Sequence, residues 1–318
     1  MPAGRRVAVE LRVPGPGERA PVCEPFWTGV RVIDGLLTFG RGARVGIFGS
    51  PGAGKSTLVE SIVDACDADA VVIALVGERG REAQRWIARS DPRTTIVCAT
   101  SDRSPCERIR GSAVAFAHAG VLRDRGLHVL LVLDSLARVA GALRERAIAA
   151  GESAGRGGYP PSVFSEMAKL VEVAGPLVRG SITLVATVLN DGDDRDPVSE
   201  AARALLDGHI VLSDRLAREG RFPAIDVLAS ASRTMPLVAG AAHAQRAECI
   251  RAAIAVLERI SDARSLGIEP VEAAACAAIA AEDQVERFLH ERGPADPGAT
   301  LAALADLADT LEVSDGHQ

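Results

Sequence analysis

Continuous apolar runs separated by amphipathic stretches run through most of this chain. The longest runs cover residues 70–76, 129–133 and 181–189, and shorter ones cover 44–48, 96–100, 210–212 and 225–228. Runs of this length without polar alternation are typical of parallel strands buried on both faces. Between the runs at 44–48 and 70–76, apolar residues recur every three or four positions, which is the period of a helix face, at Leu58, Val59, Ile62, Val63 and Cys66. The pattern predicts an α/β fold with a mostly parallel sheet.

The ends of two helical regions can also be predicted. Ser104, Pro105 and Glu107 form a capping box that begins a helix, which ends near Gly126. Beyond Met235 the chain becomes alanine-rich, with an apolar stripe from Ala247 to Leu257, a break at 267–270 and a last helix at 300–311. We therefore expect an Arg-, Pro- and Gly-rich linker at 1–24 with one candidate strand at 7–11, a nucleotide-binding domain at 25–236, and a small helical domain at 237–318.

Composition excludes several classes of protein. The 318 residues are 47% hydrophobic and 25% charged, as in a soluble globular protein. The net charge of −6 argues against a dedicated nucleic-acid binder. No apolar run reaches the roughly 20 residues that span a bilayer. The six cysteines are scattered without a CxxC pair, so we expect reduced, buried thiols and no zinc site.

The sequence from Gly49 to Ser56 matches the phosphate-binding pattern G-x-x-x-x-G-K-[ST] in full. It lies between a predicted strand and a predicted helix, where backbone N–H groups and the helix N-terminus can surround phosphate. Lys55 is one of only two lysines among 36 basic residues, which argues against the alternative of a chance match. The residues expected to contact the nucleotide here are Gly49, Pro51, Gly52, Ala53, Gly54, Lys55, Ser56 and Thr57, with the Ser56 hydroxyl as a Mg²⁺ ligand.

Acidic residues follow two of the buried runs. Glu78 lies in the segment Gly77–Glu82 after the run at 70–76, where α/β sheets place ligand chemistry; the alternative is a solvated turn. Asp134 ends the run at 129–133, as in a Walker B motif, and would hold Mg²⁺ through a water; the alternative is a helix cap. The aspartates between 191 and 196 lack the spacing of an EF-hand and predict a turn.

Several longer motifs together resemble the ATPases of bacterial type III protein export, which include the injectisome and flagellar export ATPases and are related to the F-type catalytic β subunit. The resemblance covers about residues 25–292. Besides the phosphate loop, the matching segments are Thr28–Thr38, Gly77–Glu82, Leu133–Arg138, Gly158–Phe164, Leu206–Ser213 and Phe222–Arg233. The resemblance implies a RecA-like P-loop NTPase core with a small C-terminal helical domain. Members of the family carry an N-terminal β-barrel, which we expect to be absent or truncated here.

The resemblance also implies roles for individual residues. Glu78 resembles the carboxylate that polarises the attacking water, and Arg79 resembles the arginine that supports it. Arg233 resembles the arginine finger that reaches the γ-phosphate of the neighbouring subunit. Phe222 matches the aromatic residue that packs on adenine, although an ordinary core phenylalanine would explain it as well. The implied cofactors are ATP and Mg²⁺, and the implied catalytic set is Lys55, Glu78, Arg79, Asp134 and Arg233.

These features favour an ATP hydrolase that powers type III protein export, releasing and unfolding secretion substrates. We favour the injectisome, with the flagellar system as the alternative; a RecA-like nucleic-acid translocase and a non-catalytic nucleotide-binding subunit are competing hypotheses. The expected partners are stalk and stator proteins and chaperone–substrate complexes, without nucleic acid. The expected state is a homohexamer, with a monomer as the alternative for this short form. The expected location is cytoplasmic, at the inner-membrane export gate through partners.

Overall fold

The computed structural model describes residue 9 and residues 11–89, 91–189, 196–268 and 272–315. Contacts divide the chain into two units. Unit 1 comprises residues 1–22, 41–47 and 68–207, and unit 2 comprises residues 23–40, 48–67 and 208–318. Each unit is therefore assembled from segments that are distant in sequence.

Unit 1 is built on strands in the order β3-β8-β6-β4-β5. The pairs β4/β5, β4/β6 and β6/β8 are all parallel, and a short strand, β7, pairs antiparallel with β8. Every residue of β4 is buried, as predicted for a strand covered on both faces. The strand bounds are β3 Arg44–Gly49, of which the last two residues belong to unit 2, β4 Ala70–Val76, β5 Thr94–Ala99, β6 His128–Asp134, β7 Gly175–Pro176 and β8 Ser181–Leu189.

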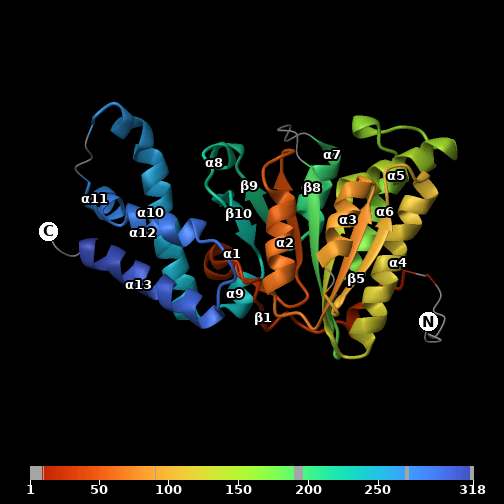
Figure 1. Cartoon of the computed structure of the whole chain (residues 1–318), viewed down its shortest axis with the longest axis horizontal. Helices are drawn as coiled ribbons and strands as arrows, with labels where there is room; N and C mark the ends of the chain where they lie inside the picture. The colour runs from red at the N-terminus through yellow and green to blue at the C-terminus, as the bar shows by residue number, and fades with distance from the viewer. Residues whose placement is uncertain (1–8, 10, 90, 190–195, 269–271, 316–318) are drawn as a thin grey trace. The chain divides into compact units, whose positions relative to one another are not determined.

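Helices pack against these strands and against one another within unit 1. Helix α4 contacts β4, β5 and β6, and α5 contacts β8 and α6 (Figure 1). The predicted capping box starts α4: the Ser104 hydroxyl accepts from the backbone N–H of Glu107, and Glu107 accepts from the backbone N–H of Ser104. The helices are η1 Pro16–Glu18, α3 Gly80–Arg89, α4 Pro105–Asp124, α5 Leu136–Ala149, η2 Arg156–Gly158, α6 Pro161–Glu172 and α7 Pro197–Leu205.

Unit 2 contains two antiparallel strand pairs and a set of helices that includes those at the C-terminal end of the chain. Strand β1 pairs with β2, and β9 pairs with β10. Helix α13 packs on α10, α11 and α1, so the last segment of the chain contacts one of the earliest helices. The elements are β1 Pro25–Phe26, α1 Arg31–Leu36, β2 Phe39–Gly40, α2 Lys55–Ala65, β9 Gly208–Leu212, α8 Asp214–Arg218, β10 Ile225–Ser232, α9 Met235–Val238, α10 Ala241–Ser265, α11 Ala273–Ala280, α12 Glu282–His290 and α13 Pro297–Asp315.

A buried aspartate organises the start of unit 2. Asp34 in α1 accepts hydrogen bonds from the backbone N–H groups of Thr28 and Gly29, at 2.8 and 2.9 Å, and from the Thr28 hydroxyl at 2.7 Å. Its side chain is fully buried, and burial raises the pKa of this carboxyl to about 7. Three donors on one buried carboxyl fix the turn that leads into α1.

The predicted α/β fold with a mostly parallel sheet and C-terminal helices is confirmed. The candidate strand at 7–11 and the turn at 191–196 fall mostly on residues outside the described ranges, as does part of the break at 267–270. The domain bounds at residues 24 and 236 stay predictions.

The prediction of buried cysteines is largely wrong. None of the six cysteines forms a disulfide, and only Cys66 is fully buried. Cys98 is exposed because β5 ends the strand order of unit 1, and Cys106 is exposed because it lies in the first turn of α4. Cys23 and Cys276 are exposed as well.

Candidate active site

The predicted phosphate loop joins the end of β3 to the start of α2, within unit 2. Gly52 and Gly54 have φ of 91° and 98°, a left-handed conformation that side chains with a Cβ rarely adopt. The Lys55 ammonium donates to the carbonyl oxygens of Gly49, at 2.7 Å, and Ser50, at 2.6 Å. The lysine side chain is therefore folded onto the loop.

The other residues of the loop and of the first turn of α2 differ in solvent exposure. Ala53 is buried, and Leu58 in the first turn of α2 anchors the helix, whereas Ser56 and Thr57 are exposed at its N-terminus. Backbone N–H groups at a helix N-terminus lack intrahelical partners and carry partial positive charge. The loop is also tied to α8, because the Ser50 hydroxyl donates to the Asp214 carboxylate.

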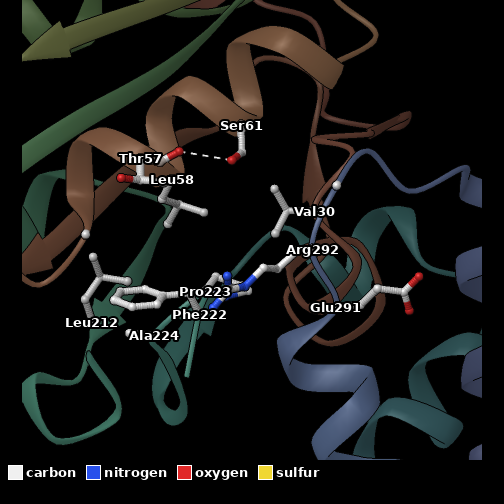
Figure 2. A pocket seen from close by; sticks show the side chains of 12 residues that line it. Val30, Thr57, Leu58, Ser61, Leu212, Phe222, Pro223, Ala224, Glu291 and Arg292 are labelled. Atoms are coloured by element: carbon white, nitrogen blue, oxygen red, sulfur yellow. Dashed lines mark hydrogen bonds between the residues drawn. The ribbon is translucent and has the colours of Figure 1, made fainter. Parts of the chain in front are cut away.

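A cavity of about 330 Å³ lies beside this loop, also within unit 2 (Figure 2). Phe222, which the sequence analysis associates with adenine, lines it together with Gly54 and Leu58. A Cβ on Gly54 would lie 3.4 Å from the Phe222 ring, so the ring packs closely against the loop. The guanidinium of Arg292 lies 5.9 Å from the centroid of the same ring. The cavity thus joins an aromatic ring and an apolar wall to the phosphate loop, as a nucleobase site requires.

The acidic residues lie in unit 1, at the carboxyl ends of adjacent parallel strands. Leu75 of β4 pairs with Asp134 of β6, so the register brings the segment after β4 next to Asp134. From the next strand, β8, the Thr187 hydroxyl donates to Asp134 Oδ1 at 2.5 Å. The alternative of Asp134 as a helix cap is wrong, because the cap of α5 is Ser135. The carboxylate of Asp134 is therefore positioned by strand ends, the usual location of ligand chemistry in parallel sheets.

Glu78 is buried, with 9% of its surface exposed, which disfavours the alternative of a solvated turn. Burial raises the pKa of Glu78 to about 7, and the hydrogen bond with Glu82 and the charge of Asp134 act in the same direction. Arg138 in α5 opposes this shift, since its Nε donates to Glu78 Oε1 at 3.1 Å. A carboxyl with a pKa near neutral pH can exchange a proton or polarise water under physiological conditions.

The two arginines of the predicted catalytic set are exposed. Arg79 precedes α3 in unit 1, and Arg233 directly follows β10 in unit 2. Sequence reasoning missed three residues that contact the predicted site residues: Arg138, Thr187 and Arg292. A signal existed for two of them, because Arg138 follows Asp134 by four residues and Thr187 carries a hydroxyl inside the apolar run 181–189. Nothing in the sequence links Arg292 to Phe222, 70 residues earlier.

Comparison with known proteins decides the family. Residues 29–232 match the nucleotide-binding domain of the ATP synthase alpha/beta family. The chain belongs to this family. Among its relatives, the SPI-2 type 3 secretion system ATPase of Salmonella typhimurium is 48% identical over 76% of the chain, and the flagellum-specific ATP synthase of Treponema pallidum is 47% identical over 86%. The chain spans 57% and 63% of the lengths of these two relatives.

Solved structures agree with this assignment. The assembled ATPase EscN of the enteropathogenic E. coli type III secretion system matches with a TM-score of 0.90 at 40% identity, over 93% of this chain and 74% of EscN. A prototypical ATPase from the type III secretion system of pathogenic bacteria matches with a TM-score of 0.85, over 93% of this chain and 88% of the other. Among the described residues, no helix is both long and apolar enough to cross a membrane.

Proposed function

We propose that this family member hydrolyses ATP and drives type III protein export. The observation that carries the proposal is the lysine of the phosphate loop, whose ammonium lies on the carbonyls of Gly49 and Ser50 in a chain of a nucleotide-binding family. In this proposal Lys55 neutralises the β- and γ-phosphates, the loop N–H groups bind their oxygens, and Phe222 stacks on the base. The whole nucleotide set is Gly49, Pro51, Gly52, Ala53, Gly54, Lys55, Ser56, Thr57 and Phe222.

Glu78 is proposed to orient the attacking water. Its buried carboxylate is held by Arg138 and has a pKa near neutral pH, so it can accept hydrogen-bond donation from water above about pH 7. Arg79 supports this role, and Arg233 stabilises the charge that develops on the γ-phosphate of a neighbouring subunit.

The side chains fit a bound Mg²⁺ without a dedicated protein cage. No cluster of three or more His, Cys, Asp or Glu that could hold a metal occurs in the described part of the chain. Mg²⁺ commonly uses one or two protein oxygens and the substrate phosphates. The exposed Ser56 hydroxyl and, through water, the Asp134 carboxylate held by Thr187 are proposed as these ligands. When bound, the ion would neutralise phosphate charge.

The relatives support the export role but do not distinguish the injectisome from the flagellar system. Identity to the secretion ATPase and to the flagellar protein is nearly equal, so both systems remain candidates, with the injectisome as our preferred hypothesis. A solved structure shows EscN in complex with its central stalk EscO. By analogy we propose a homohexamer in the cytoplasm that binds a stalk protein, a stator and chaperone–substrate complexes, and reaches the inner-membrane export gate through them.

The chain offers a matched pair of lysines for testing ATP hydrolysis. Lys169 is 62% exposed and its ammonium forms an ion pair with the nearby Glu166 at 3.0 Å, so Lys169→Gln is a control for Lys55→Gln. Phosphate release should fall at least about 100-fold in Lys55→Gln and be unchanged in Lys169→Gln. Equal loss in both variants, or no loss in either, would contradict the proposal.

Action of Arg233 between subunits can be tested by mixing two inactive variants. Arg233→Ala and Glu78→Gln should each lose nearly all turnover. If Arg233 acts on the neighbouring subunit, a mixture of the two variants contains some intact interfaces and should recover part of the activity. A mixture that stays as inactive as its components would mean that Arg233 does not act in this way.

A further inference from the structure

A cation is held against the aromatic ring of the cavity beside the phosphate loop. The Arg292 guanidinium lies 5.9 Å from the centroid of the Phe222 ring, within the range of a cation–π interaction. Arg292 Nη2 also donates to the carbonyl oxygen of Gly220 at 3.2 Å. These contacts hold the guanidinium at the ring that would stack on a nucleobase (Figure 2).

Two other polar side chains that line this cavity, those of Ser61 and Glu291, are already engaged. The Ser61 hydroxyl donates to the carbonyl oxygen of Thr57 at 3.0 Å. The Glu291 carboxylate pairs with Arg31 of α1, and in Figure 2 it points away from Phe222. Most of the remaining wall is apolar. Arg292 is therefore the strongest hydrogen-bond donor among the described side chains that line the cavity.

A guanidinium only donates hydrogen bonds, and this sets which purine it matches. Adenine carries an amino group at position 6, which is itself a donor, whereas guanine and hypoxanthine carry an oxygen there. Oxygen 6 and nitrogen 7 together accept from the two arms of one arginine. Adenine offers only nitrogen 7 on the same edge and turns its amino donor toward the guanidinium.

We propose that Arg292 is a base-specificity residue, and that the site binds 6-oxopurine nucleotides at least as tightly as adenine nucleotides. The proposal rests on the proposed function, since it assumes that the phosphates of the nucleotide lie on the loop of Lys55. It extends that function, because the substrate class becomes purine nucleoside triphosphates in general.

Calorimetric titration with ADP and IDP tests the proposal directly, because the two bases differ only in the group at position 6 and in the proton that the 6-oxo form carries on nitrogen 1. The wild-type chain should bind IDP with a Kd equal to or below that for ADP. Arg292→Gln should weaken IDP binding about tenfold and ADP binding much less. Arg292→Lys keeps the charge without the planar fork and should also lose the IDP preference.

Arg287→Gln is the matched control. Arg287 lies in α12, five residues before Arg292, is exposed, and donates from Nε to the carbonyl oxygen of Asp283. It should leave both affinities unchanged. Tighter binding of ADP than of IDP by wild type, or an equal loss of both in Arg292→Gln, would overturn the specificity role. If the wild-type chain binds neither nucleotide, the proposed function itself fails, and this inference fails with it.

Discussion

Removing Arg138 should shift the pH dependence of hydrolysis to higher pH. Arg138 Nε donates to Glu78 Oε1 at 3.1 Å and stabilises the carboxylate, against the burial that raises the pKa of Glu78 to about 7. A hydrogen bond to a charged group contributes about 1.5–3 kcal/mol. Arg138 is 40% exposed, so solvent screening favours the lower end, which corresponds to a pKa shift of about one unit.

The direction of the effect follows from the active form. If the carboxylate orients water, activity falls as pH drops through the pKa of Glu78, because the protonated form is inactive. In Arg138→Gln this acid limb should move from about pH 7 to about pH 8, so the variant should be about fivefold slower than wild type at pH 7 and nearly equal at pH 9.5.

The assay is phosphate release at saturating ATP between pH 5.5 and 9.5. Arg146→Gln, on the exposed side of the same helix, is the control and should keep the wild-type profile. The reasoning is refuted if the acid limb of Arg138→Gln lies at the same pH as in wild type or at a lower one. A uniform loss at every pH would instead indicate that Arg138 acts on something other than the protonation of Glu78.

Three further substitutions test the local structure. Gly54→Val should weaken nucleotide binding at least tenfold in a titration, because φ is 98° at this position, a conformation that strains valine, and its Cβ would already contact the Phe222 ring at 3.4 Å; unchanged binding would contradict this. Asp34→Ala should lower the free energy of unfolding in urea by about 2–4 kcal/mol, since it leaves the buried N–H groups of Thr28 and Gly29 without an acceptor. Ser104→Ala should cost about 1 kcal/mol in the same measurement, and a loss below 0.3 kcal/mol, roughly the resolution of such data, would exclude the capping box as a stabilising feature.

The elements that could be predicted from the sequence are those fixed by local patterns. The run at 70–76 becomes β4 with the same bounds, because a strand buried on both faces must be apolar throughout. The capping box at Ser104 begins α4 as predicted, since its hydrogen bonds involve neighbouring residues. The phosphate loop was found because its chemistry requires glycines and a lysine at fixed spacing.

What could not be predicted depends on contacts between distant segments. The exposure of Cys98 follows from the place of β5 at the end of a strand order that does not follow the sequence. The pKa of Glu78 is raised by burial, and Arg138, 60 residues away, opposes that rise. Arg292 reaches Phe222 only through the packing of unit 2. Local periodicity carries no information about these contacts.

The most direct test of the account compares phosphate release and nucleotide binding in wild type and Glu78→Gln at pH 8.5. At this pH the wild-type carboxyl is ionised, and glutamine keeps its size without its charge. The account predicts that Glu78→Gln binds ATP within about threefold of wild type but releases phosphate at least about 100-fold more slowly. Equal rates of phosphate release by the two proteins would contradict the claim that Glu78 orients the attacking water.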